Sequence, residues 1–395
     1  MIDRRTLIAL PGLLAVPPAF AALRRPDPDI AAIERVRVLP RATALLEAPP
    51  RTITSVPAPR SPAGRHDYYS EGDYWWPDPA NPDGPYIRRD GRSNPAKFDG
   101  HRDALIRFGA DMPMLAAAWL LTRQTRFAEA AIRHLHAWFV DPATRMNPDL
   151  RHAQAIIGRN TGRAIGIIDT LQLVEVARGA TLLARHDAPG YAAVRAGVER
   201  WFADYLSWLI ESEPGREERD EENNHGTCWL LQVAAFAGVT GRDDLLEAMR
   251  RRLFDTIVPA QIALDGSQPL ELARTKPYGY SLFNLDVLAG AAWLLSKTPG
   301  ALIRRSARGR SIAAAIAFMA PFIRDRERWP FARDIEYFED FPVRHPSLLF
   351  GGLALGRSDW LELWRRLDPD PSVGEVVRNF PIRQPVLWLV DRHGA

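Results

Sequence analysis

The sequence has 395 residues, of which 46% are hydrophobic and 25% are charged, with a formal net charge of +3 and a pI near 9.1. This composition is typical of a globular protein with a sizeable core, and it excludes disordered and collagen-like chains. Basic residues are interspersed with acidic ones and form no Lys/Arg stripe, so we expect no nucleic-acid partner. The single cysteine, Cys228, excludes an intrachain disulfide.

The first 22 residues have the pattern of an export signal. The pair Arg4-Arg5 precedes an apolar run over residues 6–20, and a small-residue cleavage site follows. Paired arginines before an apolar run are typical of a twin-arginine signal. We therefore expect the mature chain, residues 23–395, to be periplasmic or secreted. No later segment reads as long and apolar enough to span a bilayer, so no stable membrane insertion is expected.

The rest of the chain has the periodicity of helices and lacks a convincing series of alternating strands. An opening helix is expected between residues 29 and 47. After it, an Ala-rich helix, a short polar turn and a second amphipathic helix recur about every 55 to 65 residues. The turns lie near Thr122, His186, Thr240, Lys297 and Gly356. Stacked hairpins of this length predict an all-α protein, an α/α toroid of five to six helical hairpins in a single catalytic domain.

Residues 66–95 interrupt this pattern with a stretch dense in Pro, Gly and aromatic residues. A loop of this length in a compact domain is usually functional. Its rings could form flat apolar surfaces for sugars, with arginines to meet carboxylates, or they could plug one mouth of the helical array. The candidates for substrate binding are Tyr68, Tyr69, Trp75 and Trp76, beside Arg88 and Arg89.

Two short segments hold the candidates for catalysis. Asn223, Asn224 and His225 stand before an apolar helix, where an amide could simply cap the helix. About 50 residues later, Arg274, Lys276, Tyr278 and Tyr280 follow Glu271; as an alternative to a site, the tyrosines could pack in a turn and the cations could be solvated.

Amide, imidazole, guanidinium and phenol together suit β-elimination from a uronic acid. Removing the C5 proton places negative charge on the C6 carboxylate, which an amide, an imidazole and an arginine can stabilise. A tyrosine can take this proton and return one to the departing O4. Because the reference pKa of tyrosine is near 10, we expect Arg274 and Lys276 to favour the phenolate of Tyr280.

In these segments the sequence resembles the alginate lyases of the helical-toroid type and their relatives among polyuronate lyases. The resemblance rests on Asn223-Asn224-His225 and on Glu271-Leu272-Ala273-Arg274 with Tyr280, and it extends to the aromatic stretch and to "GRNTGRAIGIIDT". It implies an α/α toroid in which Asn224, His225 and Arg274 neutralise the carboxylate and Tyr280 serves as base and acid.

This chain also departs from the pattern of that family. Gly226-Thr227-Cys228 stands where the motif usually continues Ser-Tyr, and the spacing from Arg274 to Tyr280 is one residue shorter, which makes Tyr278 an alternative to Tyr280. The aromatic loop also differs from the usual lid. These departures leave the polymer open among polymannuronate, glucuronan and other uronate-containing polysaccharides.

Further candidates complete the predicted site. Arg159, Asn160 and Arg163 could meet a second uronate, although Arg163 could equally cover an apolar neighbour with its stem. Lys276 and Tyr278 are further candidates for substrate binding. No metal or other cofactor is expected, because His134 and His136 point to different faces of a helix. The expected partner is an anionic polysaccharide.

Two other functions stay open. A glycoside hydrolase on the same toroid could recruit two carboxylates from Asp67, Glu71, Asp73 and Glu271. A non-catalytic polyuronate-binding protein would use the aromatic loop alone, and its two motif segments would then lie far apart.

Overall fold

The computed structural model describes residues 29–390, so the predicted export signal lies outside the described residues. The α-helices are α1 (Ile30–Ala44), α2 (Gly100–Thr122), α3 (Thr125–Phe139), α4 (Leu173–Arg185), α5 (Ala192–Glu211), α6 (Glu213–Asp220), α7 (Asn224–Thr240), α8 (Asp243–Arg252), α9 (Val258–Gln261), α10 (Pro269–Leu272), α11 (Pro277–Leu295), α12 (Ala301–Arg304), α13 (Ile312–Arg324), α14 (Pro346–Leu355), α15 (Ser358–Arg366), α16 (Gly374–Arg378) and α17 (Pro385–Leu389). Short turns of other helix types are η1 (Ile53–Ser55), η2 (Ala164–Gln172), η3 (Leu253–Ile257), η4 (Arg326–Arg328) and η5 (Phe338–Asp340).

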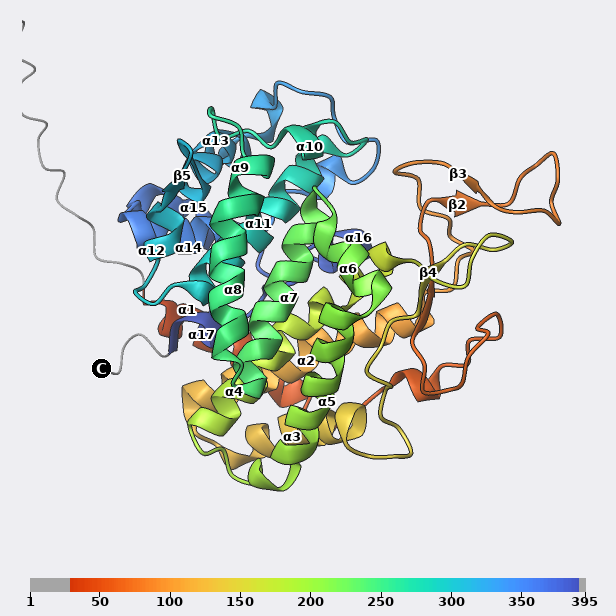
Figure 1. The fold of residues 1–395 in the computed structure, drawn as a ribbon. Coiled ribbons are helices and arrows are strands. Elements are labelled where there is room, and N and C mark those ends of the chain that lie inside the picture. The colour runs from red at the N-terminus through yellow and green to blue at the C-terminus, as the bar shows by residue number, and fades with distance from the viewer. Residues whose placement is uncertain (1–28, 391–395) are drawn as a thin grey trace, which may run out of the picture.

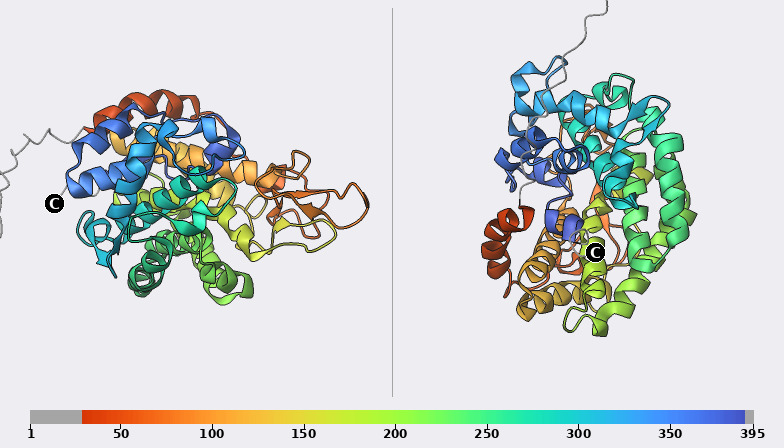
Figure 2. Two further views of the ribbon diagram at one scale, coloured as in Figure 1. Left: turned by 90° about the horizontal axis from the view of Figure 1, so that it is seen from above. Right: turned by 90° about the vertical axis from the view of Figure 1, so that its left-hand side faces the viewer.

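The helices form two curved layers (Figures 1 and 2). The inner helices α2, α4, α7, α11 and α14 contact one another in that order, and α3, α5, α8 and α15 pack outside them. The inner helices α7 and α11 are apolar on nearly every side, and a helix of this kind is stable only when neighbours cover it all round, as they do here. The predicted all-α toroid of stacked hairpins is therefore confirmed.

The turns between paired helices lie where the repeat predicts them. Three of these helices end at a residue in the left-handed conformation, Arg123 after α2, Gly241 after α7 and Gly356 after α14. This conformation lets the last helical carbonyls find donors and turns the chain back toward its partner helix. The opening helix predicted between residues 29 and 47 is α1.

Six short strands depart from the all-helical prediction. They form three two-stranded ladders: β1 (Tyr69–Glu71) with β4 (His152–Ala155) in parallel, and β2 (Trp75–Trp76) with β3 (Ile87–Arg88) and β5 (Ser306–Ala307) with β6 (Arg310–Ser311) antiparallel. Segments of two to four residues are too short to show an alternating pattern in the sequence. β1 to β4 build an arm that projects from one end of the helical layers (Figure 1).

The expectation about membrane-spanning length was wrong for one segment. Among the described residues, α2 is long and apolar enough to cross a bilayer by length and composition alone. It lies instead inside the domain, with 72% of its most apolar window buried against neighbouring helices.

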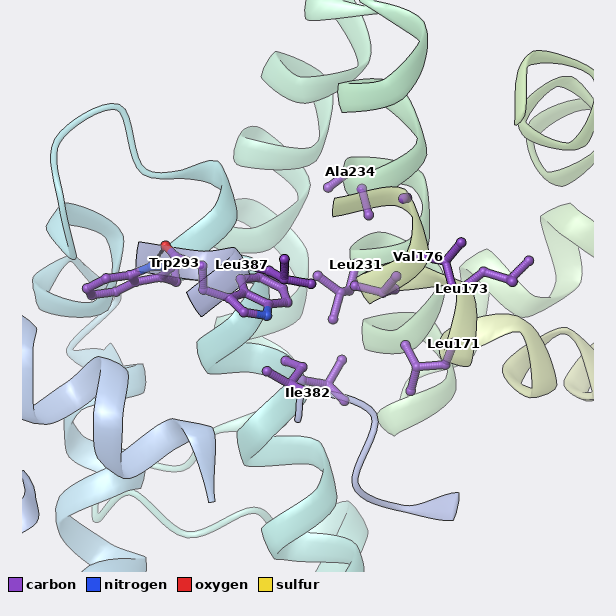
Figure 3. Close-up of a cluster of buried hydrophobic side chains, with 14 of the residues drawn as sticks. Leu171, Leu173, Val176, Leu231, Ala234, Trp293, Ile382 and Leu387 are labelled. Atoms are coloured by element: carbon purple, nitrogen blue, oxygen red, sulfur yellow. Dashed lines mark hydrogen bonds between the residues drawn. The ribbon is translucent and has the colours of Figure 1, made fainter. Parts of the chain in front are cut away.

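The C-terminal segment, residues 374–390, occupies the centre of the toroid (Figure 2). Ile382 and Leu387 lie beside Leu231 of α7, in a buried cluster that also contains Leu171 of η2 and Val176 of α4 (Figure 3). The Trp388 indole donates to Glu175 in α4, and the Trp293 indole in α11 donates to the Trp388 carbonyl. The end of the chain thus fills the space that the inner helices enclose.

Candidate active site

A cavity of about 170 Å³ lies at the end of the toroid where the arm projects. Its walls come from segments far apart in the sequence: residues 73–75 and 154–168, the starts of α7 and α11, and α16. The inner helices α7 and α11 both begin at this cavity, and α2 and α4 begin beside it. Since the N-terminal end of a helix carries partial positive charge, this end of the toroid favours an anionic ligand.

The motif serves both purposes considered for it: Asn223 caps a helix, and Asn224 lines the cavity. The side chain of Asn223 caps α7 by accepting a hydrogen bond from the His225 backbone N–H at 2.9 Å. Asn224 is buried and lines the cavity. It donates twice to Glu271, from its backbone N–H at 2.8 Å and from its side-chain amide at 2.9 Å. These two bonds hold the two motif segments together. Both use N–H groups of Asn224, so neither involves its side-chain oxygen.

His225 lines the same cavity and is oriented by a buried carboxylate. Its Nδ1 lies 2.9 Å from Glu218 Oε1, which leaves Nε2 as the ring atom that can act on a ligand. Burial by itself lowers the pKa of His225, but the charge of Glu218, the hydrogen bond to Glu218 and the charge of Glu221 together outweigh burial, so this pKa is raised above its ordinary value. The pair therefore favours a charged imidazole in the cavity.

Arg274 and Tyr280 form the opposite wall. The Arg274 Nη2 donates to the Tyr280 hydroxyl at 3.3 Å, and the guanidinium carbon lies 4.3 Å from the centre of the Tyr280 ring. The hydroxyl of Tyr74, from the arm, is 2.6 Å from the Tyr280 hydroxyl. One phenol oxygen thus meets a guanidinium and a second phenol.

The ionisation of Tyr280 differs from the sequence-based expectation. Burial raises the pKa of Tyr280, and the charge of Arg274 and the hydrogen bond from Tyr74 only partly oppose this effect. Lys276 is not a neighbour that favours the phenolate, because it is buried against two carboxylates, Glu336 at 3.2 Å and Glu375 at 3.7 Å. The expected role of Lys276 beside Tyr280 was therefore wrong.

Tyr278 lies outside the cavity, although the short spacing makes it an alternative to Tyr280. It is fully buried, its hydroxyl donates to the Phe322 carbonyl at 3.1 Å, and its ring packs against Trp329 and Phe338. Tyr278 and Tyr280 are two residues apart at the start of a helix, so they point in different directions. The structure therefore assigns Tyr278 to the core and Tyr280 to the cavity.

The aromatic loop contributes one of its four predicted rings to the cavity. Trp75 lines it, whereas Tyr68 and Tyr69 are buried and donate to Asp169 and Glu71. Trp76 is half-buried and its indole donates to the Arg92 carbonyl. The expectation that Tyr68 and Tyr69 bind substrate is contradicted by their burial, since both anchor the arm to the helical body.

The two predicted arginines after β4 flank Trp75. The guanidinium carbons of Arg159 and Arg163 lie 5.2 Å and 5.9 Å from the centre of a Trp75 ring. Arg163 lines the cavity and donates to the backbone and side-chain oxygens of Gln154. Burial lowers the pKa of Arg163 to about 10, so it still carries a charge at neutral pH. Arg159 is exposed beside the cavity.

Several residues of the cavity were not identified from the sequence. Tyr74 stands between the predicted aromatic residues, and its hydroxyl could have been included on composition alone. Glu375, Arg378 and Asn379 come from the C-terminal segment, about 100 residues after the second motif, and no local pattern marks them. Among residues 29–390, no group of three or more His, Cys, Asp or Glu side chains could hold a metal ion.

The departure at Gly226 has a local structural reason. A Cβ atom at this position would come within 2.2 Å of the Glu221 carbonyl oxygen, far inside a van der Waals contact. The chain before α7 therefore approaches the helix too closely for a serine here, while Asn224 and His225 still reach the cavity.

The chain is similar to known alginate lyases in both sequence and fold. The family model for alginate lyase matches residues 52–329. An alginate lyase from Bacteroides ovatus is 29% identical, with a TM-score of 0.76 over 90% of this chain and 93% of that chain. No curated protein matched.

Two structures of alginate lyase A1-III show the same fold at lower identity. The enzyme from Sphingomonas species A1 is 17% identical, with a TM-score of 0.51 over 84% of this chain and 91% of that chain. A histidine-to-alanine variant of A1-III in complex with a tetrasaccharide is 16% identical, with a TM-score of 0.55 over 86% and 92%. Since the family match runs over well over half of the chain and includes both motif segments, this chain belongs to the alginate lyase family and is a polysaccharide lyase.

Proposed function

We propose that this protein cleaves a polymer of mannuronate or glucuronate by syn β-elimination, with Tyr280 as base and acid. The observation that carries the proposal is that Asn224, His225, Arg274 and Tyr280, from two segments about 50 residues apart, line one cavity. Arg274 also contacts the Tyr280 hydroxyl directly. The group that neutralises a carboxylate and the group that moves a proton are thus adjacent.

The reaction assigns one task to each group. The substrate carboxylate binds near Arg274, the charged imidazole of His225 and the amide of Asn224, which together stabilise the negative charge that develops when C5 loses its proton. The ionised oxygen of Tyr280 accepts that proton, and the electron pair of the C5–H bond forms the C4=C5 double bond. The C4–O4 bond breaks, and O4 takes a proton from Tyr280, which is thereby ionised again.

The stereochemistry follows from a single phenol that serves both steps. One oxygen can remove the C5 proton and protonate O4 only where both lie on the same side of the ring, as in mannuronate and glucuronate. The proposal therefore excludes guluronate, in which they lie on opposite sides, as a good substrate.

A glycoside hydrolase is less well supported by the carboxylates of the site. Those that line the cavity are Asp73 and Glu375. Asp73 is bound by Arg102 and Arg378, which hold its pKa well below its ordinary value despite burial, so it is not available as a general acid. Glu375 is paired with Lys276 and Arg378. Of the other carboxylates considered, Asp67 accepts from Asn147, Glu71 binds Arg60, and Glu271 holds Asn224.

The products of a polymer panel test the proposal. Incubation with polymannuronate, glucuronan and polyguluronate should give ultraviolet absorbance from the C4=C5 bond with one or both of the first two polymers and little with the third. New reducing ends without this absorbance would establish hydrolysis. Binding without shortening of any of the three would establish a binding protein.

Tyr280→Phe tests the assignment of the base. The substitution keeps the ring and deletes the oxygen, so turnover should fall by about 10²-fold or more. Tyr278→Phe is the matched control: it removes a hydrogen bond in the core, costs about 1 kcal/mol of stability, and should leave turnover nearly unchanged. Retained activity in Tyr280→Phe would refute the tyrosine mechanism.

A further inference from the structure

The C-terminal segment reaches the cavity from outside the region that matches the family model. The match ends at residue 329, whereas α16 and the residue after it place Glu375, Arg378 and Asn379 in the cavity wall. The segment is fixed in position because the residues that follow, Phe380 and Ile382, are buried in the centre of the toroid. These buried residues anchor α16 at the cavity wall.

Arg378 binds the arm through a buried carboxylate. Its Nη1 donates to Asp73 Oδ2 at 2.6 Å, and the other oxygen of Asp73 accepts from Arg102 at 2.7 Å. Asp73 is buried; each of its oxygens accepts from one guanidinium, and Lys97 Nζ lies 3.7 Å from Oδ1. Removing one guanidinium leaves a buried charge only partly compensated, which shifts the carboxylate or the chain that carries it.

Asp73 is joined directly to the residue that meets the base. Tyr74 follows it in the chain, and the backbone on both sides is tied to the arm, with the Asp73 carbonyl accepting from the Asn94 N–H and the Tyr74 carbonyl accepting from the Arg89 N–H, each at 2.7 Å. The Tyr74 hydroxyl lies 2.6 Å from that of Tyr280. Contacts thus run without a gap from Arg378 through Asp73 and Tyr74 to Tyr280.

We propose that Arg378 is a positioning residue for the elimination: by holding Asp73 it places the Tyr74 hydroxyl against Tyr280, so that the C-terminal segment completes the catalytic site. The inference rests on the proposed role of Tyr280. It gives Tyr74 the task of donating a hydrogen bond to the Tyr280 oxygen when that oxygen is ionised.

The charges around Tyr280 agree with this arrangement. The hydrogen bond from Tyr74 and the charge of Arg378 both act to lower the pKa of Tyr280, against the effect of burial. The sequence had suggested Lys276 as the second cation near the phenol. In the structure this position belongs to Arg378, which comes about 100 residues later.

A double-mutant cycle between Arg378→Gln and Tyr74→Phe tests the proposal. If Arg378 acts through Tyr74, Arg378→Gln should lower kcat about 10- to 100-fold in the wild-type background, the size expected when a reacting group is misplaced. The same substitution should change kcat much less when Tyr74 is already Phe, because only the direct effect of the Arg378 charge on Tyr280 then remains. Equal losses in both backgrounds would overturn the proposal.

The KM values and a conservative variant distinguish positioning from other roles. KM for the polymer should change little in Arg378→Gln, and Arg378→Lys should recover much of kcat because a cation again faces Asp73. An increase in KM with unchanged kcat would mean that Arg378 binds substrate instead, and would overturn the proposal.

Arg344→Gln is the matched control. Arg344 is half-buried and pairs with the buried carboxylate of Glu34 at 3.3 Å, outside the cavity. It should lower the melting temperature without the loss of kcat. Tyr280→Phe separates the two hypotheses: if it retains activity, the proposed function fails, whereas an inactive Tyr280→Phe with an additive cycle refutes only the role of Arg378.

Discussion

The guanidinium of Arg274 contacts groups that a lysine could not contact together. Its Nη2 donates to Tyr280, its plane lies over the Tyr280 ring, and Asp90 of the arm is 4.0 Å away. A planar fork can hold such neighbours and still present a second N–H pair to a carboxylate, whereas an ammonium group is a compact point charge.

Arg274→Lys should therefore lower kcat/KM on polyuronate by at least about tenfold, which corresponds to about 1.4 kcal/mol of transition-state stabilisation. Arg242→Lys is the control, because Arg242 forms a forked ion pair with Asp244 on the exposed surface, away from the cavity. Steady-state kinetics of the two variants make the comparison. Equal kcat/KM values would show that Arg274 needs only its charge.

The charge of His225 depends on one buried neighbour. Glu218 raises the pKa of His225 against the effect of burial. In Glu218→Gln, burial becomes dominant, so we expect the pKa of His225 to lie below its wild-type value. The imidazole should then lose its charge at a lower pH, and elimination at neutral pH should weaken.

An NMR titration of the His225 ring in the two proteins measures this shift. His66, which is half-buried and donates from Nδ1 to the Arg145 carbonyl, serves as an internal reference. An unchanged or higher pKa of His225 in Glu218→Gln would show that Glu218 does not set the charge of the site.

At the scale of single elements, the start of α11 decides where Tyr280 lies. Pro277 occupies the first turn, where its missing N–H costs nothing. The next two N–H groups, of Tyr278 and Gly279, donate to the carboxylate of Asp334 from a distant loop at 2.7 and 2.8 Å. Asp334 thus does the work of a helix cap from outside the helix, and burial raises its pKa to about 6.

Asp334→Ala should lower the free energy of unfolding by about 1 to 2 kcal/mol, the usual cost of losing a helix cap. It should also lower kcat, because Tyr280 directly follows the two residues that Asp334 holds. Ser311→Ala removes a cap from α13, where the Ser311 hydroxyl accepts from the Ala314 N–H. Urea unfolding and kinetics of both variants check this: Ser311→Ala should cost similar stability and keep kcat. A kcat in Asp334→Ala equal to wild type would contradict the prediction.

Aromatic residues of the arm have different environments although their composition is similar. The four aromatic residues predicted to bind substrate look alike in the sequence. Tyr68 and Tyr69 lie at or next to β1, which pairs with β4 against the helical body and buries them, whereas Trp75 lies in β2, where the arm leaves that body. Which ring lines the cavity is set by this pairing between segments about 80 residues apart.

At the scale of the whole molecule, the C-terminal segment links stability to the site. Leu387 is fully buried in the centre of the toroid (Figure 3), where neighbouring inner helices can collapse only partly into a space left empty. Leu387→Ala should therefore lower the free energy of unfolding by about 2 to 5 kcal/mol. Leu264→Ala is the control, because Leu264 is 69% exposed, and it should change stability by no more than about 0.5 kcal/mol. Urea unfolding would contradict the prediction if the two costs were equal.

The sequence by itself determined the helical class and the position of each turn between paired helices, and it singled out four candidates, Asn224, His225, Arg274 and Tyr280, that line one cavity. These features are local: the apolar period, the turn residues and the motifs each lie within a few neighbouring positions. The predicted export signal also rests on the sequence alone.

Only the tertiary structure decided which side chains meet. Packing places Tyr280 at the cavity and Tyr278 in the core. It also places Lys276 against Glu336 and Glu375. It also brought Tyr74 and Arg378 to the cavity that Tyr280 lines, from segments about 300 residues apart. The physical reason is that a cavity at the end of a closed ring of helices collects residues from every turn of the chain, and the contacts among them depend on burial and on ion pairs between segments that share no local pattern.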